Sequence, residues 1–160
     1  MTEKEYNDCV DLYADGLYRF TVKNLRQEEV ARDLVQVSFE QLWKHHKEVA
    51  FQKAKSYLFT VAYHAMIDHL RSMKLRHHEP LQPEAFVQQP AVDWETKRIL
   101  EKALNELDEK QKMLIMLKDY EGYRYEEIAG ITGLSLTQVK VYLHRARKAL
   151  KRSLEKLLVF

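Results

Sequence analysis

The placement of proline constrains the fold of this chain more than any other sequence feature. Pro80, Pro83 and Pro90 are the only prolines, and all three lie within residues 77–93 of the 160 residues. Proline fixes φ and has no backbone N–H, so it interrupts a regular helix and favours extended backbone. We therefore predict two folded segments, residues 1–76 and 94–160, joined by a linker over residues 77–93.

The first segment carries three apolar stripes at helical spacing, and each stripe predicts one amphipathic helix. Their members are Tyr6, Val10, Tyr13, Leu17 and Phe20; Ala31, Val35, Phe39 and Leu42; and Leu58, Val61, Ala62, Ala65, Met66 and Leu70. Ser56 is expected to cap the third helix at its N-terminus. Three such helices can close a small bundle.

The second segment predicts four helices. The first starts near Trp94, and the next starts at Asp108, which forms a capping-box spacing with Gln111, and runs to Tyr120. Gly122 suits a left-handed C-cap that ends this helix. With few glycines and no sustained alternation of polar and apolar residues, the chain is expected to be all-α, with two small helical domains.

The end of the chain has the features of a helix-turn-helix. Ala129 is a small residue in the first helix, Gly133 permits a tight turn, and Ser135 is a suitable N-cap for the last helix. From Val139 to Arg152 there are six Lys or Arg and no acidic residue, which suits a polyanionic partner such as DNA. Charge is segregated elsewhere too: residues 1–50 carry −3 and residues 111–160 carry +5.

Three segments carry a combined pattern: GYRYEEIAGITGLSLTQVKVYLHRARKAL (122–150), DLVQVSFEQLW (33–43) and KSYLFTVAYHAMIDHLR (55–71). Together they resemble the extracytoplasmic function (ECF) group of bacterial sigma-70 family sigma factors. Residues 122–150 resemble their promoter-reading C-terminal region. Residues 33–43 resemble the polymerase-binding helix, and residues 55–71 resemble the helix that faces the promoter minus-10 element. The order and spacing of the three segments, with a linker between the domains, make this resemblance more specific than the helix-turn-helix alone.

The resemblance implies a transcription initiation factor that binds core RNA polymerase and promoter DNA, with a separate anti-sigma factor as a further partner. It implies three sets of binding residues. Those for the minus-35 element are Gln138, Lys140, Val141, His144, Arg145 and Lys148; those for the minus-10 element are Phe51, Lys53, His64, Asp68 and Arg71; those for polymerase are Asp33, Gln36, Val37 and Glu40. Arg147, Lys151 and Arg152 are expected to contact phosphates.

The chain departs from the family pattern at several positions. Val37 replaces an acidic residue on the polymerase-facing helix, and His64 replaces an Asn, where a hydrogen bond to Asp68 is an alternative to base contact. Arg124 replaces a small N-cap, which should cost about 1 kcal/mol of capping energy. Val141 is the first residue of a pair that is frequently Ser-Arg, so the promoter preference is expected to be unusual.

Other function classes fit less well. We expect no catalytic residues, cofactor or metal, because the pairs His45–His46 and His77–His78 lack accompanying ligands and no nucleophile or phosphate-loop motif occurs. Cys9 is the only cysteine, and its ordinary role is a small buried hydrophobe. With no signal segment or membrane-spanning stretch, the protein is expected to be cytoplasmic. A standalone helix-turn-helix regulator and a protein-interaction module remain alternatives.

Overall fold

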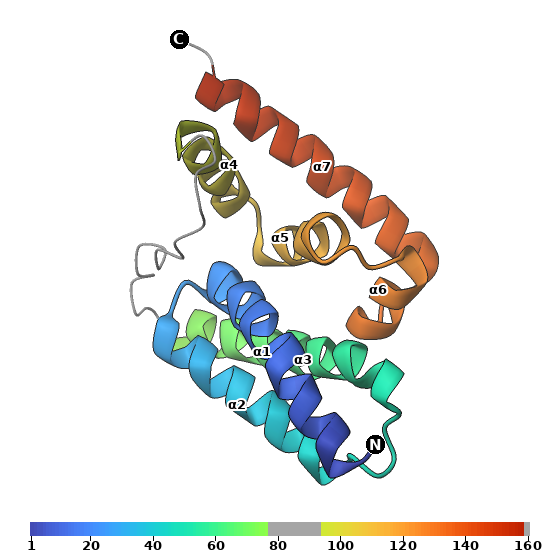
Figure 1. Ribbon diagram of the computed structural model, residues 1–160. Helices are drawn as coiled ribbons and strands as arrows, with labels where there is room; N and C mark the ends of the chain where they lie inside the picture. Colours follow the sequence, from blue (N-terminus) through green and yellow to red (C-terminus); the bar gives the residue numbers. More distant parts are fainter. Residues whose placement is uncertain (77–93, 159–160) are drawn as a thin grey trace. The chain divides into compact units, whose positions relative to one another are not determined.

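The computed structural model describes residues 1–76 and 94–158, and the regular elements within these ranges are all helices (Figure 1). These residues form two compact units, one on each side of the proline-bearing segment. The prediction of an all-α chain with two helical domains is confirmed within the described residues. The predicted linker, residues 77–93 with Pro80, Pro83 and Pro90, lies outside the described residues.

The first unit is a three-helix bundle of α1 (Glu3–Leu25), α2 (Glu28–Lys44) and α3 (Ala54–Arg76), with a short 3₁₀ turn, η1 (Phe51–Lys53), before α3. Each helix packs against the other two, and aromatic side chains occupy the centre. The Phe20 and Phe59 ring centroids lie 5.2 Å apart, and Tyr6 meets Phe39 edge-on at 6.5 Å. This core fixes which faces of α2 and α3 remain exposed.

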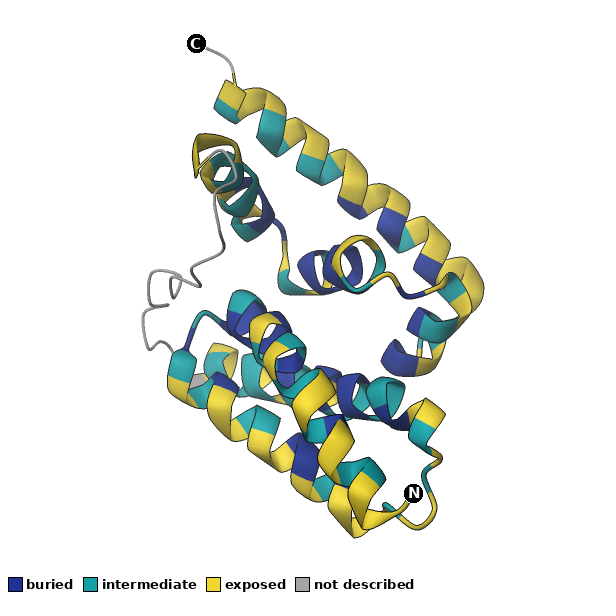
Figure 2. Cartoon of the chain, viewed as in Figure 1, coloured by how far each residue is buried: buried dark blue, intermediate teal, exposed yellow. Residues whose placement is uncertain are grey.

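The second unit consists of α4 (Trp94–Glu106), α5 (Glu109–Ile115), a π-helical segment η2 (Met116–Tyr120), α6 (Tyr125–Thr132) and α7 (Leu136–Leu158). The helix α7 packs against α4, α5 and α6 in turn. Its apolar residues Val139, Leu143 and Ala146 are buried, and its opposite face is exposed along most of its length (Figure 2). The predicted four-helix arrangement therefore holds, with one irregularity between α5 and α6.

Caps predicted from sequence are present in the second unit. Asp108 accepts a hydrogen bond from the Gln111 N–H at 2.9 Å, and Ser135 and Gln138 form a reciprocal capping box at 2.9 and 3.1 Å. Gly122 and Gly133 both adopt positive φ, 74° and 78°. Glycine tolerates this conformation without a Cβ penalty, so these positions end one helix and begin the turn to the next.

Three local predictions were wrong or incomplete. Ser56 does not cap α3, because the 3₁₀ turn η1 carries the chain into a helix that starts at Ala54. The helix ending at Tyr120 is not a continuous α-helix, since its last five residues are π-helical. At Arg124 the lost side-chain cap is partly replaced, because Glu127 accepts from the Arg124 backbone N–H at 3.0 Å.

Candidate nucleic-acid and protein-binding surfaces

The exposed face of α7 gathers every residue predicted to read the minus-35 element. Gln138, Val141, Arg145 and Lys148 recur three or four residues apart and form one stripe, and Lys140 and His144 lie on the adjacent one. All six side chains are exposed, including the apolar Val141 at 39%. The helix thus offers cationic, amide and apolar groups together, which are the group types that read base edges in a major groove.

Two of these cations lie near aromatic rings. The Lys140 Nζ is 5.9 Å from the Tyr125 ring centroid, and the Arg145 guanidinium carbon is 6.0 Å from the Tyr142 ring centroid. Contacts of this kind restrain a long cationic side chain while its charged end remains accessible. Sequence reasoning did not assign a role to Tyr125, because nothing in its local pattern shows that it faces α7.

Arg147 differs from the other basic residues of α7. Its guanidinium binds the carboxylate of Asp119 in η2, with Nη2–Oδ1 at 2.8 Å and Nε–Oδ2 at 3.4 Å. The hydrogen bond to Asp119 raises the pKa of the Arg147 guanidinium further above its ordinary value. Lys148, Lys151 and Arg152 are exposed, as a phosphate-contacting set requires.

The residues predicted to contact polymerase form one exposed strip on α2. Asp33, Gln36, Val37 and Glu40 recur at helical spacing and are all exposed, with Val37 at 41%. The Gln36 amide donates to Glu40 Oε1 at 3.2 Å, which holds these two polar groups side by side. An exposed valine between carboxylates suits a protein partner that supplies both cations and apolar contact.

The residues predicted to contact the minus-10 element do not form one site. His64, Asp68 and Arg71 lie on a single exposed face of α3, whereas Phe51 and Lys53 belong to η1 at the start of that helix. Ten or more residues of helix separate the two groups, which corresponds to about 15 Å along the axis. Phe51 is half-buried and Lys53 is exposed. The structure therefore places these residues in two separate groups, one in the η1 loop and one on a face of α3.

The alternative role considered for His64, a hydrogen bond to Asp68, is not seen. In the described part of the chain, no hydrogen bond joins these two residues, and the His64 ring instead meets the neighbouring Tyr63 edge-on with centroids 5.3 Å apart. Both His64 and Asp68 are exposed. Their polar groups are consequently available to a ligand.

One exposed aromatic group at the end of α2 was not predicted. Trp43, 43% exposed at the end of α2, stacks on the His46 ring at 4.3 Å and 10°, and Tyr6 meets it at 4.9 Å. The sequence signal that could have identified this group is a Trp directly after the last residue of an amphipathic stripe. His46 lies in the turn that leads from α2 towards Phe51.

Neither a metal cluster nor a membrane span is found in the described ranges. Residues 1–76 and 94–158 contain no group of three or more His, Cys, Asp or Glu placed to hold a metal ion. His77 and His78 lie outside the described residues. No helix among those described is long and apolar enough to cross a membrane.

Comparison with known proteins matches both units to one family. Residues 9–76 match the model for sigma-70 region 2, and residues 97–150 match the model for sigma-70 region 4. The chain is 29% identical to the ECF RNA polymerase sigma factor SigM of Bacillus subtilis over 150 residues, covering 91% of this chain and 92% of SigM. It is 27% identical to the ECF RNA polymerase sigma factor SigL of Mycobacterium tuberculosis over 154 residues, covering 92% and 87%.

The fold also matches a solved structure, the sigma factor RpoE of Bartonella quintana in complex with the anti-sigma factor NepR. The TM-score is 0.76 at 24% identity, covering 95% of this chain and 98% of that one. Two all-helical domains, matched in order to regions 2 and 4, define a small two-domain sigma factor. The chain belongs to the ECF group of the sigma-70 family, which confirms the resemblance seen in its three segments.

Proposed function

We propose that this protein is a transcription initiation factor that binds core RNA polymerase, directs it to specific promoters and assists promoter melting. In this proposal residues 1–76 bind polymerase and the minus-10 element, and residues 94–160 bind the minus-35 element. Residues 77–93 link the two domains. The observation that carries this proposal is the exposed basic face of α7, which follows a capped turn and is backed by buried Val139, Leu143 and Ala146.

The side chains of α7 supply a chemically complete set for reading duplex DNA. Arg145 and Lys140 can donate to guanine or to phosphate, the Gln138 amide can pair with adenine, and Val141 can contact a thymine methyl group. Lys148 and the cations after it are suited to phosphate, which positions the helix without reading sequence. Binding should therefore combine base selection with a steep dependence on salt.

The first domain supplies a protein-binding strip and a path for single-stranded DNA. The α2 strip around Val37 is acidic and suits a basic, partly apolar surface on the polymerase. In this proposal half-buried Phe51 at η1 stacks on an unpaired base, and exposed Arg71 on α3 contacts the strand further along. Stacking and charge together favour the melted form of the minus-10 element over the duplex.

We further propose a separate anti-sigma factor as partner, no catalytic activity of its own, and action in the cytoplasm, where polymerase and chromosome meet. The sigma factor of similar fold is solved in complex with an anti-sigma factor, which supports this class of partner. Sigma factors are generally non-catalytic transcription factors.

A run-off transcription assay with core polymerase and a promoter library tests the proposal. Core polymerase plus this protein is expected to give discrete transcripts from a subset of promoters, and neither component alone should do so. The variant Glu40→Lys, on the α2 strip, should give less transcription than wild type when the protein is limiting, while remaining folded. Active core that forms no open complex with this protein on any sequence would exclude the proposed function.

The alternative is a standalone helix-turn-helix regulator, which shares the α7 surface. Such a regulator binds a palindromic duplex as a dimer, without polymerase. The α2 strip favours the polymerase-dependent interpretation, because a standalone regulator has no need of it. Sedimentation of the free chain and duplex binding without polymerase separate the two: a dimer that binds duplex tightly alone supports the alternative.

A further inference from the structure

The pairing of Arg147 removes one cation from the free basic face of α7. Arg147 and Asp119 are 28 residues apart, and two donors of the guanidinium reach two oxygens of the carboxylate. A forked pair of this kind fixes orientation as well as distance, which a lysine cannot do. Each partner is 44% exposed, so the pair lies at the surface and not in the core.

Tyr125, the first residue of α6, connects the same elements. Its ring lies 4.6 Å from Lys118 Nζ and 5.9 Å from Lys140 Nζ. Lys118 belongs to η2, whereas Lys140 and Arg147 belong to α7. The tyrosine ring thus lies near one cation of η2 and one cation of α7, and the second of these, Lys140, is a proposed DNA contact.

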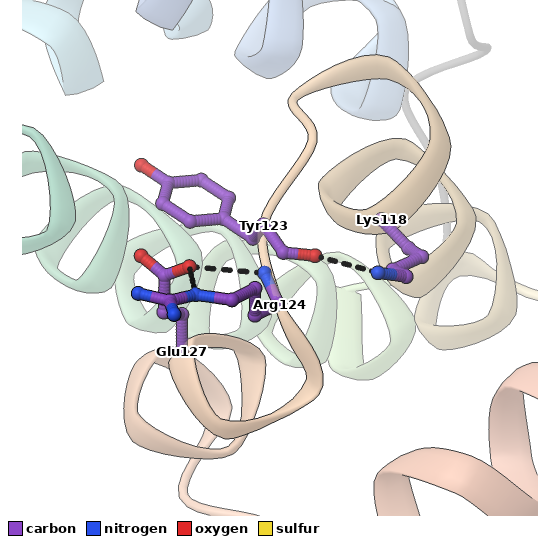
Figure 3. Close-up of polar contacts among 4 residues, drawn as sticks. All are labelled: Lys118, Tyr123, Arg124 and Glu127. Carbon is purple, nitrogen blue, oxygen red and sulfur yellow. Dashed lines mark hydrogen bonds and ion pairs between the residues drawn. The ribbon is translucent and has the colours of Figure 1, made fainter.

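The π-helical turn supplies the residues that face α7. Its defining bond joins the Glu121 N–H to the Met116 carbonyl at 2.9 Å. Such turns are rare and occur frequently at functional sites. Lys118 also donates to the Tyr123 carbonyl at 3.2 Å, close to where Glu127 holds Arg124 at the start of α6 (Figure 3). The segment between η2 and α6 is therefore held at both ends.

We propose that Asp119, Arg147 and Tyr125 are positioning residues for minus-35 recognition, which hold α7 against η2 and α6 and set the direction of Lys140. This rests on the proposed function and adds to it a specific role for an acidic residue of η2. Arg147, on this view, is not a phosphate contact. The three residues are hereafter the α7 brace.

The two roles of Arg147 predict opposite effects for its partner. If Arg147 binds phosphate, neutralising Asp119 releases a cation to the DNA and removes a repulsive charge, so promoter binding strengthens. If the brace positions α7, neutralising Asp119 loosens the helix and weakens binding to the correct minus-35 element. The two hypotheses therefore predict changes in promoter affinity of opposite sign when Asp119 is neutralised.

The experiment uses the full chain with core polymerase on a promoter selected from the library, and on the same promoter with a scrambled minus-35 element. Asp119→Asn and Arg147→Lys are compared with wild type, with Glu155→Gln as the charge-matched control, since Glu155 is exposed on α7 outside the brace. Discrimination between the two promoters is expected to fall about three-fold for both brace variants and to stay constant for the control. For Asp119→Asn the slope of log affinity against log salt should stay constant, whereas release of Arg147 to a phosphate would steepen that slope by about 0.9.

Asp119→Asn binding as tightly as wild type or tighter, with Arg147→Lys unchanged, would overturn the proposal. A second readout stands apart from transcription: in NMR spectra of the free chain, the Arg147 Nε–H should exchange slowly with water and should exchange faster in Asp119→Asn. Rapid exchange in wild type overturns the brace whatever the polymerase assay gives. If the brace is seen by NMR and no open complex forms, the proposed function fails and the brace does not.

Discussion

The side chain of Gln138 has two tasks, because it closes the capping box of α7 and also faces the proposed DNA. Its Oε1 accepts from the Ser135 N–H at 2.9 Å, which leaves the amide NH₂ as the group that donates to adenine. Gln138→Glu keeps the capping acceptor and places a negative charge at a helix N-terminus, which stabilises the helix. The same change removes the donor and brings a charge that repels phosphate.

We therefore expect Gln138→Glu to keep the thermal stability of wild type while promoter binding by the holoenzyme falls by about 1–3 kcal/mol. Gln138→Ala should lose both the cap and the promoter contact, and its free energy of unfolding should fall by about 0.5–1 kcal/mol. Calorimetry and filter binding measure the two effects separately. Wild-type promoter affinity in Gln138→Glu would show that this side chain caps the helix and does nothing else.

Cys9 is fully buried in α1, and burial raises the pKa of its thiol. The unfolded chain therefore loses the thiol proton at lower pH than the folded chain. Stability from this group is complete below the ordinary thiol pKa, about 8.5, and declines as pH rises above it. Cys9→Ala should flatten the decline in unfolding free energy between pH 8 and about 10, measured by urea titration. A decline of wild-type steepness in the variant would assign it to other groups, such as Tyr6, whose pKa burial also raises.

Among the elements, the turn between α6 and α7 permits a matched pair of glycine substitutions. Gly133 has a φ of 78°, whereas Gly130 lies within α6, and a Cβ added at either position would meet no atom within 4 Å. Gly133→Ala should destabilise the domain by about 1–2 kcal/mol, because an L-residue resists this conformation. Gly130→Ala should stabilise α6 by about 0.5–1 kcal/mol. Thermal unfolding, with amide exchange in α6 and α7 to locate the effect, measures both; equal effects would mean that φ does not decide this turn.

Among the local features of the helices, some could be predicted from the sequence and others could not. Caps and turns were predictable because Asp108, Ser135 and Gly133 act on their own neighbours, within about one helical turn. The π-helical form of η2 was not, because its apolar spacing suits an α-helix equally well. The polar side chains of η2 bond to residues far away in the sequence, as Asp119 does to Arg147. The same reason explains why the brace was missed and Arg147 was grouped with the phosphate contacts.

At the scale of the whole molecule, periodicity predicted which face of each helix is exposed but not how separate stretches combine. The α7 and α2 surfaces each lie on one helix, so helical spacing predicted the exposed faces, and the family resemblance supplied the binding residues. The predicted minus-10 residues span η1 and α3, and their separation depends on where α3 begins. With Ser56 predicted as the start of α3, the sequence did not give the distance between the η1 residues and the α3 face.

The division of labour between the domains can be tested by reversing one charge in each. Glu40→Lys on α2 and Lys148→Glu on α7 change the net charge by equal and opposite amounts, and both residues are exposed, so folding should be unaffected. Glu40→Lys should weaken binding to core polymerase. Once enough protein is added to saturate the core, it should leave the choice of minus-35 sequence unchanged.

Lys148→Glu should have the converse effect, with core binding as in wild type and weaker promoter binding with a smaller salt slope, since one phosphate contact accounts for about 0.9 of that slope. Fluorescence anisotropy with labelled core and with labelled promoter, each over a salt series, measures the four combinations. An effect that followed net charge alone would weaken or strengthen both bindings in each variant. A crossed pattern, in which each variant impairs only one binding, can arise only if the two surfaces act on different partners.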